Sequence, residues 1–190
     1  MTEIYQLKIV TVGIKPKIER VLWIQSTATF LKLHDILQSL FGLYACHLFE
    51  FYPSRDVSPI SDGHDHSRLA KNVKLSTEFR YTKKVDYTYD FGDDWRFAIT
   101  LQKIVSAISL LDYPFCVDGT GGMLIEDCGG SYCYNLLTAW CRDKTSENKE
   151  AVLEQFDEDM LEVYEDFDPD RFDRDEVNRI IGQKKKMINF

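Results

Sequence analysis

The chain has 190 residues, 44% of them hydrophobic and 28% charged, and its formal net charge is −8. This length favours a single domain over residues 1–190, and the composition excludes a disordered, collagen-like or low-complexity protein. No apolar run approaches the ~20 residues that cross a bilayer, and the N-terminus lacks the basic and apolar regions of a secretory signal, so we expect a cytoplasmic protein without a membrane partner.

Two strands are predicted at the start of the chain. Apolar and polar residues alternate over residues 5–9, which is the period of a strand with one exposed face. A turn with glycine and proline follows at residues 13–16, and residues 18–24 predict a second strand. The chain therefore opens with a predicted hairpin.

A helix and a third strand come next. Thr29 is placed to cap a helix over residues 30–41, where apolar side chains recur at helical spacing, and Gly42 ends it. Residues 47–52 predict a strand. Residues 53–67 are polar and rich in turn formers, so they predict an exposed loop.

A second hairpin is predicted in the middle of the chain. Apolar side chains alternate with polar ones over residues 85–91 and again over residues 95–101. The two apolar sets share one face of a sheet only if the connecting loop has an odd number of residues. We therefore predict a three-residue or bulged turn that pairs Phe91 with Trp95.

Helices dominate the C-terminal part. Residues 119–130 contain five of the ten glycines and predict a loop, and residues 134–142 predict a helix. Residues 147–165 predict one amphipathic acidic helix, and Asp173 is placed to cap a last helix. Because the strands precede these helices, we predict an α+β domain. It has a mostly antiparallel sheet with one helix packed on it, flanked by an acidic helical segment over residues 147–190.

The net negative charge of the chain comes from a segment near the C-terminus. Residues 147–176 hold fourteen acids and three bases, and the rest of the chain holds seventeen acids and twenty bases. Binding nucleic acid through a basic face requires clustered cations that displace counterions, and the composition shows no such face, so we expect no nucleic-acid partner of this kind. The three lysines at residues 184–186 are interpreted as the solvated end of a helix.

The cysteines are interpreted as small buried thiols: Cys46, Cys116, Cys128, Cys133 and Cys141. Their number is odd and no Cys-x-x-Cys pair occurs, so a disulfide framework is not expected. Structural zinc sites usually have more closely spaced ligand pairs. We therefore expect neither a metal nor a cofactor.

Several blocks of sequence carry a family likeness. They are residues 5–8, 47–51, 87–95, 126–130 and 167–169. The central blocks have the patterns Tyr-Asp-Phe-Gly-Asp-x-Trp and Glu-Asp-x-Gly-Gly. On these blocks the chain resembles the plasmid pRiA4b ORF-3-like family. The resemblance implies an α+β domain without an established activity.

Two turns that are far apart in the sequence hold the candidate site. If the glycine loop packs over the turn at Gly92, five carboxylates converge: Asp90, Asp93, Asp94, Glu126 and Asp127. Close carboxylates raise one another's pKa unless a cation compensates, and Arg20, Arg80 and Arg96 are candidates for that role. The predicted binding cleft comprises His47, Asp90, Gly92, Asp93, Asp94, Trp95, Glu126, Asp127, Gly129 and Gly130.

Two functions remain open for this cleft. The leading one is a non-enzymatic binding or interaction domain with a protein or small-molecule partner, in which the aspartates satisfy their own turns. It predicts an exposed apolar or acidic patch near the cleft or on the acidic helix. The alternative is a metal-dependent hydrolase of phosphoester or amide bonds, which requires the Asp90 and Glu126 carboxylates within roughly 10 Å of each other. The sequence assigns no residue a catalytic role.

Overall fold

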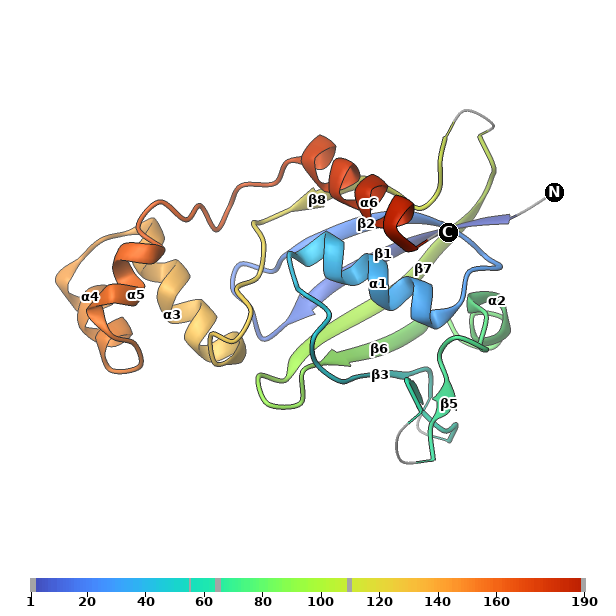
Figure 1. Cartoon of the computed structure of the whole chain (residues 1–190), viewed down its shortest axis with the longest axis horizontal. Helices are drawn as coiled ribbons and strands as arrows, with labels where there is room; N and C mark the ends of the chain where they lie inside the picture. The colour runs from blue at the N-terminus through green and yellow to red at the C-terminus, as the bar shows by residue number, and fades with distance from the viewer. Residues whose placement is uncertain (1–2, 55, 64–65, 109–110, 189–190) are drawn as a thin grey trace.

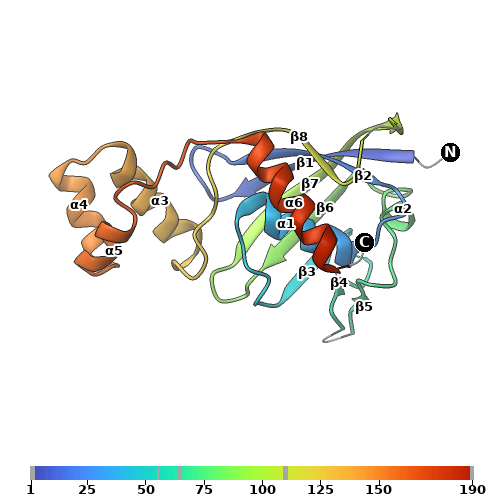
Figure 2. The ribbon, with the colours of Figure 1, turned by 45° about the horizontal axis from the view of Figure 1, so that its top comes forward.

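The computed structural model describes residues 3–54, 56–63, 66–108 and 111–188. The chain forms an eight-stranded sheet in the order β5-β4-β3-β6-β7-β1-β2-β8, antiparallel except for the β4–β5 pair. Helix α1 covers one face of the sheet, α6 lies beside α1 and β8, and α3 to α5 form a separate group at one end (Figures 1 and 2). The predicted α+β class is confirmed. No described helix is both long and apolar enough to cross a membrane.

The predicted N-terminal hairpin lies in the interior of the sheet, next to its β8 edge. Strands β1 (Glu3–Val12) and β2 (Glu19–Gln25) pair antiparallel, with their inward side chains buried. Strand β7 (Trp95–Ser106) lies on the other side of β1, and β8 (Phe115–Thr120) on the other side of β2. The strand that begins the chain therefore joins the two halves of the sheet.

Both predicted ends of helix α1 (Phe30–Phe41) are confirmed. The Thr29 hydroxyl accepts a hydrogen bond from the backbone N–H of Lys32 at 3.2 Å, which satisfies one of the free donors of the first turn. Gly42 ends the helix at φ 78°, a backbone conformation that glycine adopts without a Cβ penalty. The apolar stripe of α1 packs on the sheet.

The segment after α1 contains more strand than predicted. Strand β3 (Phe49–Tyr52) is followed by β4 (Ile60–Ser61) and β5 (Arg68–Leu69), and helix α2 (Leu75–Glu78) comes next. The prediction of an exposed loop over residues 53–67 is therefore wrong at β4, which is fully buried and pairs with β3. Two isolated residues are too short to show a periodic pattern in the sequence.

The second hairpin has the predicted faces but a different register. Strand β6 (Lys84–Tyr89) pairs with β7 so that Tyr89 lies opposite Trp95, two residues earlier than predicted. Phe91 lies in the turn and is exposed. The Asp90 side chain accepts the Gly92 N–H at 2.9 Å and starts the turn early. The loop still has an odd length, so both apolar sets face the core.

The acidic segment folds into two short helices instead of one. Helix α3 (Gly130–Arg142) is followed by α4 (Ser146–Leu153) and α5 (Glu158–Val163). A straight helix would not bring both Val152 and Leu161 inward, whereas the turn between α4 and α5 buries both.

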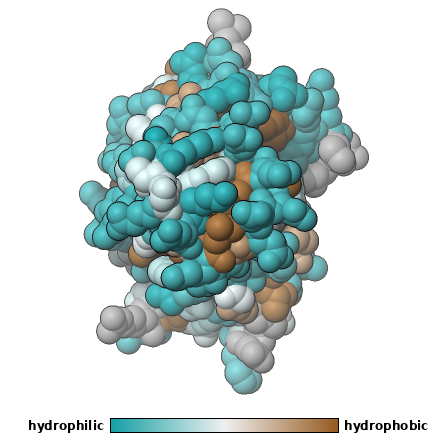
Figure 3. All heavy atoms as spheres, turned by 90° about the vertical axis from the view of Figure 1, so that its left-hand side faces the viewer, coloured by the Kyte–Doolittle hydropathy of each residue, from teal (hydrophilic) through white to brown (hydrophobic). Residues whose placement is uncertain are grey.

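Helix α6 (Arg174–Ile188) begins at the predicted cap. The Asp173 carboxylate accepts the N–H groups of Asp175 and Glu176 at 3.0 and 2.9 Å. Figure 3 views the end of the molecule formed by α3 to α5, which is mainly hydrophilic with a small apolar area. The exposed acids of this segment include Glu154, Glu158 and Glu162.

His34 belongs to the core, as its position beside the apolar stripe of α1 predicts. Its Nδ1 lies 2.8 Å from the Tyr87 hydroxyl, and its ring stacks on Phe49 with a centroid distance of 3.8 Å. Gln38 donates a second hydrogen bond to Tyr87 at 2.9 Å. Burial lowers the pKa of His34 to about 3, so the imidazole is neutral in the folded protein near neutral pH.

This buried histidine predicts a loss of stability in acid. Below about pH 6.5 the unfolded chain binds a proton at His34 that the folded chain does not bind, so the free energy of unfolding falls as the pH falls toward 3. We expect this one residue to contribute a slope of at most about 1.4 kcal/mol per pH unit. Urea unfolding of the wild type and of His34→Gln between pH 6.5 and 4.5 measures it. Parallel stability curves for the two proteins would contradict the assignment.

Candidate functional site

The loop between α1 and β3 is held in place by side chains of the core. Gln38 accepts the Ala45 N–H through its Oε1 at 3.3 Å, and the Tyr89 hydroxyl accepts the Cys46 N–H at 3.2 Å. Ala45 has a φ of 59°, which is uncommon for a residue with a Cβ. These bonds place Cys46 and His47 beside the end of β6.

The two turns predicted to meet are in contact. The Gly129 N–H donates to the Asp93 carboxylate at 3.2 Å. Gly130 approaches so closely that a Cβ on it would lie 2.1 Å from the Asp93 carbonyl oxygen. The loop before α3 therefore packs directly on the β6–β7 turn, which brings carboxylates from both segments to the His47 ring.

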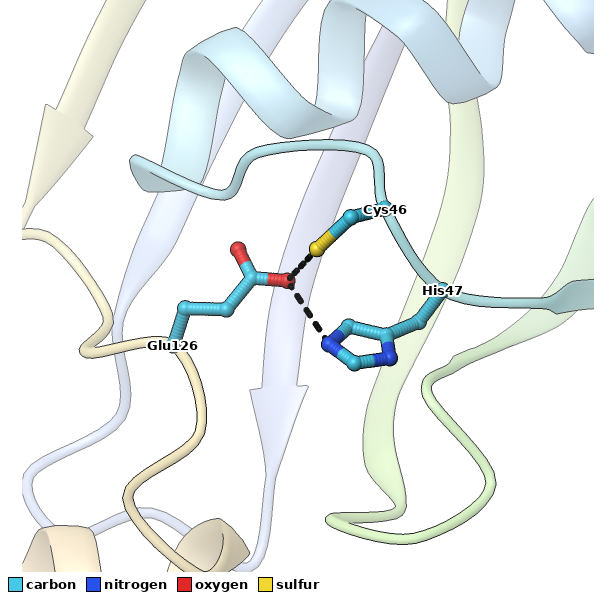
Figure 4. A group of neighbouring side chains, drawn as sticks. All are labelled: Cys46, His47 and Glu126. Carbon is cyan, nitrogen blue, oxygen red and sulfur yellow. Dashed lines mark hydrogen bonds and ion pairs between the residues drawn. The ribbon is translucent and has the colours of Figure 1, made fainter.

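Glu126 is a buried carboxylate that accepts three hydrogen bonds. Its Oε1 accepts the Cys46 thiol at 3.5 Å (Figure 4). Oε1 also accepts the Tyr89 hydroxyl at 2.5 Å, and Oε2 accepts the Tyr44 N–H at 2.5 Å. Burial and the neighbouring Glu126 raise the pKa of Tyr89, so the phenol remains a donor. Local desolvation and the nearby carboxylates of Glu126 and Asp127 raise the pKa of Cys46, although this residue is exposed, and keep its thiol protonated.

His47 points its Nε2 into a group of carboxylates. The nitrogen lies 3.0 Å from Asp127 Oδ1, 3.7 Å from Asp90 Oδ2 and 3.7 Å from Glu126 Oε1. The nitrogen is buried, and despite the 3.0 Å contact it has no hydrogen-bond partner among the described residues, because alignment as well as distance defines a hydrogen bond. We call His47, Asp90, Glu126 and Asp127 the carboxylate cleft.

Two aspartates of the carboxylate cleft have an unusual backbone. The φ of Asp90 is 54° and that of Asp127 is 57°, in the left-handed region that aspartate tolerates better than most residues. Asp90 Oδ1 accepts the Gly92 N–H, so its other oxygen faces His47. The left-handed conformation is thus part of what turns both carboxylates toward one point.

The cleft contains two sets of three possible metal ligands. In one, His47, Asp90 and Asp127 each offer an atom, and in the other Cys46, His47 and Glu126 do so. Within each set the three ligand atoms lie within 4.8 Å of one another. Imidazole nitrogen with carboxylate oxygen suits zinc, iron and manganese, and a thiolate would favour zinc.

Other residues of the predicted site lie elsewhere. Asp94 pairs with Arg96 at the surface and lines a hollow on the open face of the sheet. Trp95 is buried in the core, with its ring edge against Tyr134. Gly92 lies in the exposed turn and contacts the cleft only through its N–H bond to the Asp90 carboxylate.

The proposed compensation by arginines is wrong. Arg20 is fully buried, and its described hydrogen bonds all go to backbone carbonyls and not to the carboxylates of the cleft. Arg96 pairs with Asp94, and Arg80 lies over the ring of Tyr81. In the described contacts the cleft has His47 as its single cationic candidate.

Sequence analysis missed two residues of this site, Cys46 and Tyr89. Cys46 directly precedes His47 in the sequence. A thiol next to an imidazole could have indicated a pair of transition-metal ligands. Tyr89 sits in the alternating pattern of a core strand, so no signal distinguished its hydroxyl from its apolar neighbours. Tyr89 contributes to the site because the buried Glu126 carboxylate lies within hydrogen-bond distance of its hydroxyl.

Comparisons with known proteins agree with the fold. The sequence model of the family described as Plasmid pRiA4b ORF-3-like protein matches residues 3–176. Uncharacterized protein y4hQ of Sinorhizobium fredii (strain NBRC 101917 / NGR234) is 28% identical over 159 residues, which cover 81% of this chain and 81% of that protein. The crystal structure of MM3350, a protein of unknown function from Methanosarcina mazei Go1, is 31% identical with a TM-score of 0.78, and covers 93% of this chain and 98% of that chain. These relatives indicate fold and family but no activity.

Proposed function

This chain belongs to the plasmid pRiA4b ORF-3-like protein family, and we propose that its carboxylate cleft binds one divalent transition-metal ion through His47, Asp90 and Asp127. The observation that carries the proposal is the buried His47 Nε2, which faces three carboxylates without a hydrogen bond to any of them. The domain acts as a non-enzymatic binding module for a protein or small-molecule partner, and its binding depends on the metal. This departs from the expectation of no metal, which rested on the cysteine spacing and on aspartates that satisfy their own turns.

Electrostatics favours a cation at this point. A neutral His47 with its lone pair at Nε2 would face carboxylate oxygens and be repelled by them. A protonated ring would be attracted, but its N–H would be poorly aligned with each oxygen. A metal ion at the common focus accepts the imidazole lone pair and neutralises the carboxylates together.

The ligand set with Asp90 and Asp127 is better suited than the one with Cys46 and Glu126. Glu126 already accepts three hydrogen bonds, so few of its lone pairs remain for a metal. Cys46 would also have to lose a proton that its raised pKa retains. Asp127 is largely exposed and can adjust toward an ion.

Zinc titration tests the proposal. The purified chain is first treated with a chelator, which is then removed. Zn²⁺ is titrated into the protein, and the heat of binding gives the stoichiometry and the Kd. We expect one ion per chain, and His47→Gln or Asp127→Asn to weaken binding by at least about tenfold, since each removes a direct ligand. We expect zinc at about 100 times its Kd to raise the free energy of unfolding by about 2.7 kcal/mol.

Matched variants make this test specific. Asp94→Asn removes a carboxylate from the same turn but not from the cleft, and we expect nearly unchanged zinc affinity. Cys46→Ser separates the two ligand sets, and unchanged affinity supports the aspartate set. Equal losses for Asp94→Asn and Asp127→Asn, or zinc binding without saturation, would refute the metal site.

A metal-dependent hydrolase is the second candidate. Asp90 and Glu126 each have an oxygen 3.7 Å from His47 Nε2, so their separation meets the limit set from the sequence. A metal with three protein ligands keeps a position where water can bind and lose a proton. Zinc-dependent cleavage of an activated phosphate ester that Asp127→Asn abolishes would favour the hydrolase over the binding module.

We also propose a cytoplasmic location. The support is that all five cysteines are free, which is typical of a reducing compartment. Two of them are buried as predicted, but Cys46 is exposed and Cys133 and Cys141 are half-buried.

A further inference from the structure

A second hollow lies at the opposite end of α1 from the carboxylate cleft. It has a volume of about 600 Å³, in the range of pockets that hold small ligands. Its walls come from several parts of the chain: Lys32 in the first turn of α1, Gln25 at the end of β2, Asp112 before β8, and Arg179, Lys185 and Lys186 on α6. We call this hollow the basic pocket.

The basic pocket has a positive charge, whereas the chain as a whole has a negative one. It contains four cationic side chains and a single acid, in a chain with a net charge of −8. Lys185 contacts the Asp112 carboxylate at 3.1 Å and its carbonyl at 2.8 Å. Arg179 and Lys186 have no ion-pair partner within the described part of the chain. A diffusing anion is therefore attracted here and repelled by the acidic segment over residues 147–176.

Two ammonium groups, those of Lys32 and Lys185, line the same hollow and are partly withdrawn from water. The Lys185 side chain is only 12% exposed, and Lys32 is half-buried. Burial lowers the pKa of Lys32, and the charge of Lys185 lowers it further. Both effects disfavour the protonated form of Lys32, and the charge of an anion in the pocket would favour that form again. The sequence alone suggested a solvated helix end, but α6 packs its lysines against α1 and the segment before β8.

The glycine in the middle of α6 adds an independent observation. Gly182 lines the pocket, and a Cβ on it would meet no atom within 4 Å. The fold therefore does not require glycine there, although glycine disfavours a helix interior relative to alanine. Its missing side chain keeps the helix wall of the pocket open.

The geometry points to a compact anion with two or more phosphate groups as the ligand of the basic pocket, and we propose this site as a binding function distinct from the metal site. Several cations around one hollow match several negative charges on one small molecule. A long nucleic acid fits less well, because it needs an extended basic face, and outside residues 147–176 the chain has only twenty bases against seventeen acids. Gln25 offers a neutral donor beside the cations.

Binding of inorganic tripolyphosphate tests the proposal. Calorimetry at low ionic strength uses the whole chain after chelator treatment, so that a metal in the carboxylate cleft does not bind the probe. We expect one saturable site, and Arg179→Gln or Lys186→Gln to weaken it by at least about fivefold, with affinity falling as salt rises. The matched control is Lys184→Gln, which removes the same charge from the same helix but lines a different hollow, and should change the affinity less than about twofold.

A second variant separates the pocket from general charge effects. Gly182→Glu adds a carboxylate to the hollow without removing a cation, and we expect it to abolish tripolyphosphate binding while the circular dichroism spectrum stays unchanged. The proposal is overturned if tripolyphosphate does not saturate. It is also overturned if Lys184→Gln weakens binding as much as Arg179→Gln, or if a single-stranded oligonucleotide binds where tripolyphosphate does not.

Discussion

Replacing Arg20 with methionine is expected to lower the free energy of unfolding by about 3–5 kcal/mol, because the change leaves several buried carbonyls without a donor. Arg20 is fully buried on β2. Its guanidinium donates four hydrogen bonds, at 2.7 to 3.0 Å, to carbonyls of Leu40, Glu19, Thr120 and Gly122. These bonds join the end of α1 to the end of β8 and the loop after it.

The environment of Arg20 explains why a carboxylate is not needed. The guanidinium lies over the rings of Phe41 and Phe172, at 5.3 and 4.7 Å from their centroids. Aromatic faces and carbonyl dipoles both attract a cation. Burial lowers the pKa of Arg20 to about 10, so the group is still charged at neutral pH.

Urea unfolding measures this effect. Arg20→Lys keeps a charge but not the four-donor fork, so we expect an intermediate loss of stability. The control is Arg96→Met, which removes an exposed arginine paired with Asp94 and should change the stability little. A stability for Arg20→Met within about 1 kcal/mol of the wild type would contradict this account of the buried guanidinium.

Replacing Gly130 with alanine is expected to destabilise the protein by about 3 kcal/mol or more and to weaken zinc binding with it. The φ of Gly130 is 74°, which a residue with a Cβ rarely adopts. The added Cβ would also lie 2.1 Å from the Asp93 carbonyl oxygen, so the backbone of one turn has to move. That movement separates Asp127 from Asp90, which lie on opposite sides of the contact.

Thermal unfolding and zinc titration of the same variant test both effects. Gly182→Ala is the matched control, because its Cβ meets no atom within 4 Å. We expect it to leave the stability unchanged or raise it by up to about 1 kcal/mol, since alanine favours a helix interior. Wild-type zinc affinity in Gly130→Ala would show that the cleft does not depend on this contact.

The elements whose patterns are local were predicted well. The hairpin of β1 and β2, the capped helix α1 and the alternating strands β6 and β7 all appear where the sequence predicts them. The errors lie where a local hydrogen bond or packing overrides the period. Asp90 shifts the β6–β7 register by two residues, and the turn between α4 and α5 breaks the predicted acidic helix.

The candidate site was predicted in part. Asp90, Glu126 and Asp127 come together at His47, whereas Asp94 faces the other side of the sheet. Neighbouring positions on a turn point in different directions, and the sequence does not give the backbone angles that decide between them. The contribution of Cys46 likewise depends on how the loop after α1 is held.

The amino-acid sequence by itself determined the strands and helices with a regular period, the buried face of each, and the family of the chain, but not the short elements β4, β5 and α2 or the strand β8. Periods of two and of 3.6 residues are local properties, so they can be read without knowing any partner. Only the tertiary structure decided the strand order, the carbonyls around Arg20 and the meeting of Tyr44 with Glu126, 82 residues apart. Such contacts depend on how the whole sheet and its helices pack together, and periodicity along the chain does not specify them.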